Sequence, residues 1–310
     1  MISKILEQGW VIRLQSGFYT VKIATGIVIC GIRGKLKKVD YGGDFIALGD
    51  KVKIQRLEEG RGVIESIDDR RNALVRMAPT PKGDYRQILL ANTDQIVLVF
   101  ACAQPEPHLG MLDRFLVISE KEKIPALIVA NKTDLVEESE AKHIFGLYEK
   151  LGYPVLYTSA KEGIGTQKLR YRLGGKISGF AGPSGAGKSS LLNAIQPGLG
   201  LNVGKVKEAT YKGRHTTNVR EMFSLKNGGF VADLPGLRSV ALWDTQPEEL
   251  DGYYPEIRDL VKSCQFNDCT HRNEPGCEVK QALKRGKLDP SRYESYLRIR
   301  FGNKQLNYNR

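Results

Sequence analysis

The stretch Gly182-Pro183-Ser184-Gly185-Ala186-Gly187-Lys188-Ser189 fits the pattern G-x-x-x-x-G-K-[ST] and decides the fold around it. An apolar run at 177–181 precedes it, and a helix-like run at 190–195 follows it. Between a strand and a helix, glycines let backbone N–H groups surround an anion at the helix start. We therefore predict a phosphate-binding loop that includes Ser190, rather than a glycine-rich turn carrying a lysine by chance. Lys188 would reach the β- and γ-phosphates, and the Ser189 hydroxyl would bind Mg²⁺.

The residues before this loop alternate between buried strands and helices. The predicted strands lie at 95–100, 124–130 and 153–158, and the predicted helices lie at 111–122 and 141–151. Such alternation predicts an α/β domain with a mostly parallel sheet and helices on both faces. Ligands bind such sheets at the carboxyl ends of their strands.

Two short polar motifs follow the second and third of these strands. Asn131-Lys132-Thr133-Asp134 fits N-K-x-D, and Thr158-Ser159-Ala160-Lys161 contains S-A-K. The Asp134 carboxylate can accept hydrogen bonds from N1–H and the exocyclic amine of guanine, a pairing that adenine cannot reproduce. Alone, N-K-x-D could be a polar turn, but beside a phosphate loop it indicates guanine recognition. The predicted base-side residues are Asn131, Lys132, Asp134, Ser159, Ala160 and Lys161.

Two stretches after the loop have the composition of nucleotide-sensing switches. Residues 211–217 contain His215 and a Thr pair, and residues 229–236 form a short strand that ends in D-x-x-G. Asp233 would hold Mg²⁺ through water, and the Gly236 amide would contact the γ-phosphate. Thr217 would close on the same ion. The predicted magnesium set is therefore Ser189, Thr217 and Asp233.

A cysteine and histidine cluster lies near the C-terminus. Cys264, Cys269, His271 and Cys277 follow C-x₄-C-x-H-x₅-C, which supplies four ligands and leaves no open position for catalysis. We predict one structural Zn²⁺ per chain, the alternative being reduced thiols beside a chance histidine. Helices are expected at 247–262 and 279–300, and the basic second one could contact RNA or simply face solvent.

The N-terminal part has a β pattern. Candidate strands lie at 10–14, 18–23, 27–30, 50–54 and 62–67, and five strands in so short a segment predict an OB-type barrel. A basic loop at 33–38 and the aromatic pair Phe18 and Tyr19 could serve RNA through phosphate contacts and stacking, although at least one ring should pack in the core.

Composition narrows the functional classes. Of 310 residues, 47 are Lys or Arg and 35 are Asp or Glu, so the net charge is +12 and a polyanionic partner is favoured over a merely solvated basic surface. No apolar run reaches the roughly 20 residues that span a membrane, and no signal-peptide core follows Met1. Five unevenly placed cysteines do not form a disulfide framework. We expect a cytoplasmic protein.

The motif order carries a resemblance to a known family. Ordinary GTPases run phosphate loop, switch Thr, D-x-x-G, N-K-x-D and S-A-K, whereas here the last two come first, as in a circular permutation. With a β-barrel before and a Cys/His cluster after, the chain resembles the bacterial small-subunit-dependent GTPases of the RsgA or YjeQ family. The resemblance implies an RNA-binding OB domain at 1–68, a linker at 69–90, a permuted GTPase domain at 91–244 and a zinc-binding domain at 245–310.

The same resemblance implies a function and a catalytic residue. It implies a monomeric GTPase that binds the 30S subunit and its 16S rRNA late in assembly, with GTP hydrolysis stimulated by the subunit and coupled to release. The alternative is an RNA-binding module that senses GTP and GDP with little catalysis. Leu237 stands where Ras-like enzymes place a water-orienting Gln. In the family His215 is the proposed replacement, although it could instead contact rRNA.

Overall fold

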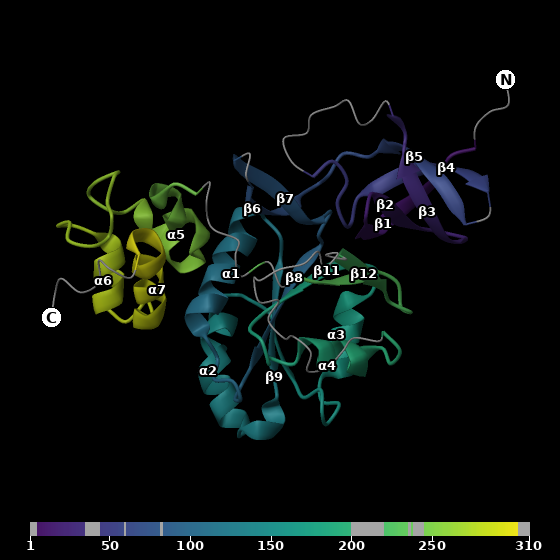
Figure 1. Cartoon of the computed structure of the whole chain (residues 1–310). Coiled ribbons are helices and arrows are strands. Elements are labelled where there is room, and N and C mark those ends of the chain that lie inside the picture. The colour runs from purple at the N-terminus through teal and green to yellow at the C-terminus, as the bar shows by residue number, and fades with distance from the viewer. Residues whose placement is uncertain are drawn as a thin grey trace.

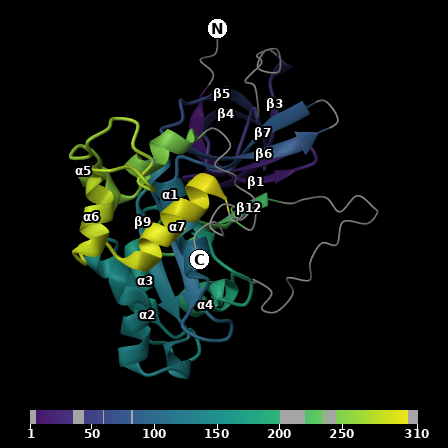
Figure 2. The same cartoon turned by 90° about the vertical axis from the view of Figure 1, so that its left-hand side faces the viewer.

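The computed structural model describes residues 5–34, 44–58, 60–80, 83–199, 220–234, 237 and 245–302. Three parts follow one another along the chain: an N-terminal barrel, a central α/β domain and a C-terminal helical module (Figure 1). The predicted multidomain fold class is confirmed. Seen from the side in Figure 2, the helical module again lies against the α/β domain, below the barrel.

The barrel consists of the five predicted strands. They are β1 (Glu7–Gln15), β2 (Phe18–Ile23), β3 (Gly26–Ile32), β4 (Lys51–Glu58) and β5 (Arg61–Ile67). Their order β1-β2-β3-β5-β4 closes on itself because β4 also pairs with β1. Alternate residues such as Val11, Val21 and Ile64 are fully buried inside, as the two-residue period of a strand requires.

The segment 69–90, for which the sequence predicts a linker, contains most of a β-hairpin. Strands β6 (Ala73–Thr80) and β7 (Gly83–Ala91) pair antiparallel. The linker was predicted from the proline and charged residues of this segment. The apolar residues Leu74 and Leu90, which indicate a strand pair, are buried at the base of the hairpin. Asp44 of the barrel region holds β7 in place, because its carboxylate accepts hydrogen bonds from Tyr85 Oη and Ile88 N, both at 3.0 Å.

The central domain has a six-stranded sheet in the order β10-β9-β8-β11-β13-β12. The parallel strands are β8 (Gln95–Ala101), β9 (Ala126–Asn131), β10 (Val155–Thr158), β11 (Ile177–Ala181) and β13 (Phe230–Asp233), and β12 (Arg220–Ser224) runs antiparallel to β13. Strand β12 also pairs with β1 through Arg13–Glu221 and Leu14–Arg220, so the sheet continues into the barrel.

Helices cover both faces of this sheet, as predicted (Figure 1). Alternate residues of β8 divide between two cores: Ile96, Leu98 and Phe100 pack with α1 and α2, while Val97 and Val99 pack with α3 and α4. The helices are α1 (Leu109–Lys121), α2 (Glu138–Lys150), α3 (Thr166–Leu173) and α4 (Lys188–Ile195). Burial on both faces explains why the strands are continuous apolar runs.

The C-terminal module is helical, but the two long helices that the sequence predicts are each broken. The structure has a 3₁₀ segment η4 (Pro247–Tyr253) followed by α5 (Pro255–Val261), and then α6 (Glu278–Lys284) followed by α7 (Pro290–Phe301). Each break precedes a proline at the first position of the next helix. Proline disfavours the helical conformation in the residue before it, and Tyr254 and Asp289 are accordingly extended.

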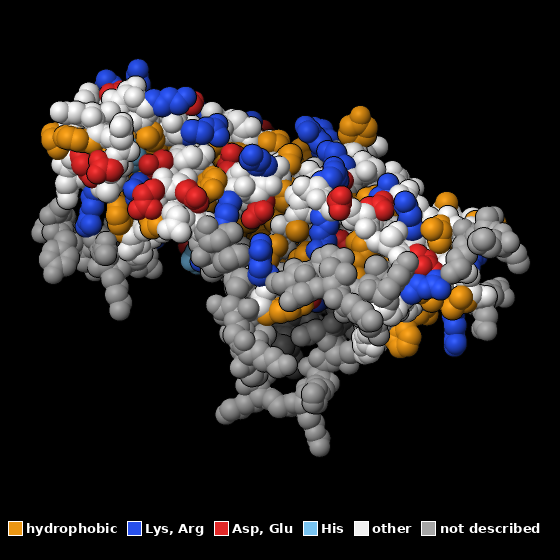
Figure 3. All heavy atoms as spheres, turned by 90° about the horizontal axis from the view of Figure 1, so that it is seen from above, with side chains coloured by type: hydrophobic (Ala, Val, Ile, Leu, Met, Phe, Trp, Pro, Cys, Tyr) orange, Lys and Arg blue, Asp and Glu red, His pale blue; other side chains and the backbone are white. Residues whose placement is uncertain are grey.

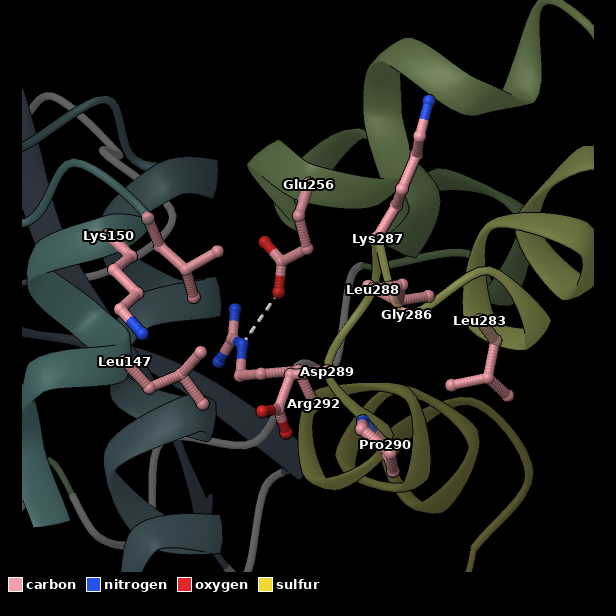
Figure 4. A pocket seen from close by; sticks show the side chains of 11 residues that line it. Leu147, Lys150, Glu256, Leu283, Gly286, Lys287, Leu288, Asp289, Pro290 and Arg292 are labelled. Atoms are coloured by element: carbon pink, nitrogen blue, oxygen red, sulfur yellow. Dashed lines mark hydrogen bonds and ion pairs between the residues drawn. The ribbon is translucent and has the colours of Figure 1, made fainter. Parts of the chain in front are cut away.

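The helical module packs on α1 and α2 through a buried arginine. Arg292 of α7 is 1% exposed, and its guanidinium pairs with Asp113 of α1 and, at 2.7 Å, with Glu256 of α5. Figure 4 shows this side chain extended from α7 toward Leu147 and Lys150 of α2. The rings of Tyr254 and Tyr148 lie 4.6 and 5.8 Å from its guanidinium carbon. In the part of the chain that the structure describes, no helix is long and apolar enough to cross a membrane.

Candidate nucleotide and metal sites

The predicted phosphate loop connects β11 to α4, at the carboxyl edge of the sheet. Gly187 immediately precedes α4, and both Gly182 and Gly187 have positive φ angles, 147° and 91°. A Cβ at Gly182 would collide with the carbonyl oxygen of Val99, and a Cβ at Gly187 would collide with the side-chain amide of Asn131. Only glycine fits these two positions, because side chains are excluded by both the backbone angle and the space.

Lys188, the first residue of α4, points back over the loop. Its Nζ donates to the carbonyl oxygens of Gly182 and Pro183, each at 3.0 Å. The ammonium group is thus held above the backbone that the sequence assigns to phosphate binding. Ser189 and Ser190 follow on the first turn of α4, where free backbone amides and the helix dipole favour an anion.

The two base-side motifs lie next to this loop. Asn131 ends β9, and its Nδ2 donates to Ala186 O at 2.9 Å. The Asn131 Oδ1 accepts from Thr158 Oγ1 at 3.1 Å and from Ala160 N at 3.3 Å. The buried Asn131 side chain therefore connects the N-K-x-D motif to the S-A-K motif and to the phosphate loop. Its most distant partner in the sequence, Ala186, is 55 residues away.

Asp134 and Ser159 come together at the same edge. Ser159 Oγ donates to Asp134 Oδ1 at 2.5 Å, which fixes the orientation of a carboxylate that is otherwise exposed. Lys132 has a left-handed backbone conformation, and its Nζ donates to Gln104 O. Lys161 forms an exposed ion pair with Glu162 at 3.4 Å. Gln104 could not be predicted as part of this site, because it lies in a loop outside any motif and meets Lys132 only in the folded chain.

The structure describes only some of the predicted switch residues. Strand β13 ends at Asp233, which pairs in register with Phe180 of the strand that leads into the phosphate loop. Leu237 is fully buried in the main hydrophobic core. His215, Thr217 and Gly236 lie outside the described residues, and their roles remain predictions.

The four predicted zinc ligands are brought together in the C-terminal module. Their ligand atoms lie within 4.8 Å of one another, and Cys269, His271 and Cys277 are buried. His271 Nδ1 lies 3.6 Å from Cys264 Sγ and 3.4 Å from Cys277 Sγ. Zn–S and Zn–N bonds of ordinary length at a tetrahedral angle give about 3.6 Å between sulfur and nitrogen. The cluster therefore has the donors and spacing that Zn²⁺ requires.

Burial favours the neutral thiol form of the cysteines in this cluster, with raised pKa values for Cys269 and Cys277. Burial raises the pKa of the Cys269 thiol to about 12 without a metal. A bound Zn²⁺ would stabilise the thiolate form that burial otherwise disfavours.

The loop that carries the ligands is stabilised by Glu274, whose carboxylate accepts hydrogen bonds from Thr270 N and Arg272 N at 2.9 Å each. Although burial opposes ionisation of Glu274, these hydrogen bonds and that of the Thr270 hydroxyl lower its pKa to about 2.

The order of the sheet defines the class of protein. Strand β11, which leads into the predicted phosphate loop, lies between β8 and β13, while β9 and β10, which lead into the predicted base-side motifs, come earlier in the chain. The central domain is a circularly permuted P-loop GTPase domain.

The chain belongs to the RsgA GTPase family, and it is a GTP-hydrolysing enzyme. The family model "RsgA GTPase" matches residues 67–243, and the model "RsgA N-terminal domain" matches residues 8–64.

Individual relatives match most of the chain. A protein of Gemmatimonas aurantiaca named small ribosomal subunit biogenesis GTPase RsgA is 44% identical over 87% of this chain and 88% of its own length. One with the same name from Alkaliphilus metalliredigens is 40% identical over 95% and 97%. The crystal structure of YjeQ from Thermotoga maritima aligns with a TM-score of 0.78, at 36% identity over 96% of this chain and 98% of that one. YloQ, described as a circularly permuted GTPase, aligns with a TM-score of 0.73 at 32% identity, over 97% of this chain and 96% of that one.

Proposed function

We propose that this GTPase binds the small ribosomal subunit and acts late in its assembly in the cytoplasm. The subunit stimulates hydrolysis of GTP to GDP and phosphate, and hydrolysis is coupled to release. The observation that carries this proposal is the extent of similarity: relatives named for small-subunit biogenesis match the barrel and the helical module as well as the GTPase domain. A GTPase domain alone would not indicate a partner.

The nucleotide would lie along the carboxyl edge of the sheet. The phosphates would occupy the loop 182–189, and Mg²⁺ would be held by Ser189, by Asp233 through water and by Thr217. The guanine base would lie against Asp134 and Lys132. The hydrogen bonds of Asn131 to both sides of this edge support the arrangement, because they hold the base and phosphate regions at a fixed separation.

The barrel would supply part of the contact with 16S rRNA. Phe18 is 61% exposed at the start of β2, whereas its neighbour Tyr19 packs against the barrel core. An exposed aromatic ring can stack on an unpaired base. Most of the basic loop at 33–38 lies outside the described residues. On the face in Figure 3, Lys and Arg side chains lie over all parts of the molecule, mixed with Asp and Glu.

Measurement of GTP turnover with and without purified small subunits tests the proposal. We expect stimulation of at least about tenfold at saturating subunit, because positioning of water and charge supplies most of the acceleration of phosphoryl transfer. Large ribosomal subunits at the same concentration provide the control. Equal turnover with and without small subunits, together with nucleotide-dependent RNA binding, would favour the sensing module instead.

A further inference from the structure

The histidine of the metal cluster uses both of its ring nitrogens. His271 Nδ1 faces the sulfurs of Cys264 and Cys277, and Nε2 lies 3.2 Å from Asp251 Oδ2. His271 is fully buried and Asp251 is 14% exposed, so few water molecules can compete for this hydrogen bond. An imidazole that binds a metal through one nitrogen carries its proton on the other.

The second carboxylate oxygen of Asp251 also accepts hydrogen bonds. Its Oδ1 accepts from Tyr296 Oη at 2.5 Å and from Arg300 Nη1 at 2.7 Å, both on α7. The ring of Tyr296 also lies against that of His271, with centroids 6.0 Å apart. The carboxylate thus has little freedom to turn away from the histidine.

We propose that Asp251 is a positioning residue of the zinc site, which accepts the Nε2 proton of His271 and thereby directs Nδ1 at the metal. This inference rests on the zinc site proposed from the cluster above. Asp251 belongs to η4, thirteen residues before Cys264, and η4 packs against α1 of the GTPase domain. Zinc binding would therefore link the loop 264–277 to η4, in addition to holding the loop closed around the metal.

The test compares zinc affinity in variants of the full chain, measured by competition with a chromogenic chelator. Asp251→Ala should raise the zinc dissociation constant about 10- to 100-fold, the usual effect of losing such a partner. Asp251→Asn should raise it less, because the amide oxygen still accepts a hydrogen bond. The control is Tyr296→Phe, which removes a hydrogen bond to the same carboxylate and leaves the His271 contact and the ring in place.

A second measurement separates positioning from general packing. In ¹⁵N NMR spectra of the zinc-loaded protein, the His271 Nε2–H signal should be protected from exchange in the parent and in Tyr296→Phe, and should lose protection in Asp251→Ala. Unchanged zinc affinity in Asp251→Ala, or an equal loss in Tyr296→Phe, would overturn the assignment of Asp251. If the parent itself bound no zinc, the metal site would fail and this inference with it, while subunit-stimulated turnover would be unaffected.

Discussion

At the scale of single residues, we predict that Asp134 determines the choice of base. Its carboxylate is held by Ser159 Oγ and otherwise open to ligand. Asp134→Asn should lower GTP affinity at least about 100-fold, because a site built to pair with guanine leaves polar groups unpaired when the match is lost. Affinity for xanthosine triphosphate should rise, since the new amide can donate to the oxo group that replaces the guanine amine. Binding of both nucleotides by isothermal titration measures the switch.

A nearby charge change provides the control for this experiment. Glu137→Gln removes one exposed carboxylate three residues away and should leave the preference for guanine unchanged. If Asp134→Asn bound GTP as tightly as the parent, the base would lie elsewhere.

His215 is the residue that we predict to position water for hydrolysis. Leu237, in the place of the usual Gln, is fully buried in the core and has no polar group that could orient a water molecule. His215→Ala should therefore keep GTP and subunit binding but lose about 10²-fold or more in subunit-stimulated kcat. Titration of the variant with subunits measures kcat and binding separately. Restored turnover at saturating subunit would instead make His215 an RNA contact.

At the scale of elements, Arg292 joins the helical module to the GTPase domain. Replacing it by Met leaves the carboxylates of Asp113 and Glu256 without their cation, and such a loss in a buried site costs about 3–5 kcal/mol. We expect Arg292→Met to lower the midpoint of urea unfolding and to expose the junction after Tyr253 to protease. Arg298→Met, on the exposed side of α7, should change stability by less than about 1 kcal/mol. Equal effects of the two changes would contradict the role of Arg292.

The elements also show what can be predicted from sequence. The parallel strands of the sheet are set by local patterns, such as the apolar runs before Gly182 and Asn131, and they form as expected, whereas no pattern predicted the antiparallel strand β12. The breaks before Pro255 and Pro290 could have been predicted from the restriction on the preceding residue. The contacts of Asp251 and Arg292 could not have been predicted, because their partners lie 20 to 179 residues away in the sequence and have no fixed spacing from them.

At the scale of the whole molecule, three modules are attached to one sheet by different means. The barrel is attached through backbone pairing of β1 with β12, and the helical module through side chains on α1 and α2. Chain segments on either side of β12 and β13 contain the predicted switch residues. The barrel is therefore joined to the GTPase domain at β12, next in sequence to a stretch that should respond to the nucleotide.

The pairing of β1 with β12 has a further consequence, for solubility. Without the barrel, β12 would present unpaired N–H and C=O groups at the border of the sheet, and such an edge is a template for other chains. A shortened chain that begins at residue 69 should therefore self-associate in a concentration-dependent way, which light scattering can follow. Ser224→Lys, which adds a charge at an exposed position of β12, should reduce the association of this shortened chain, as charged edge strands resist pairing. On this prediction the barrel would protect the GTPase domain from aggregation, independently of any role in binding RNA.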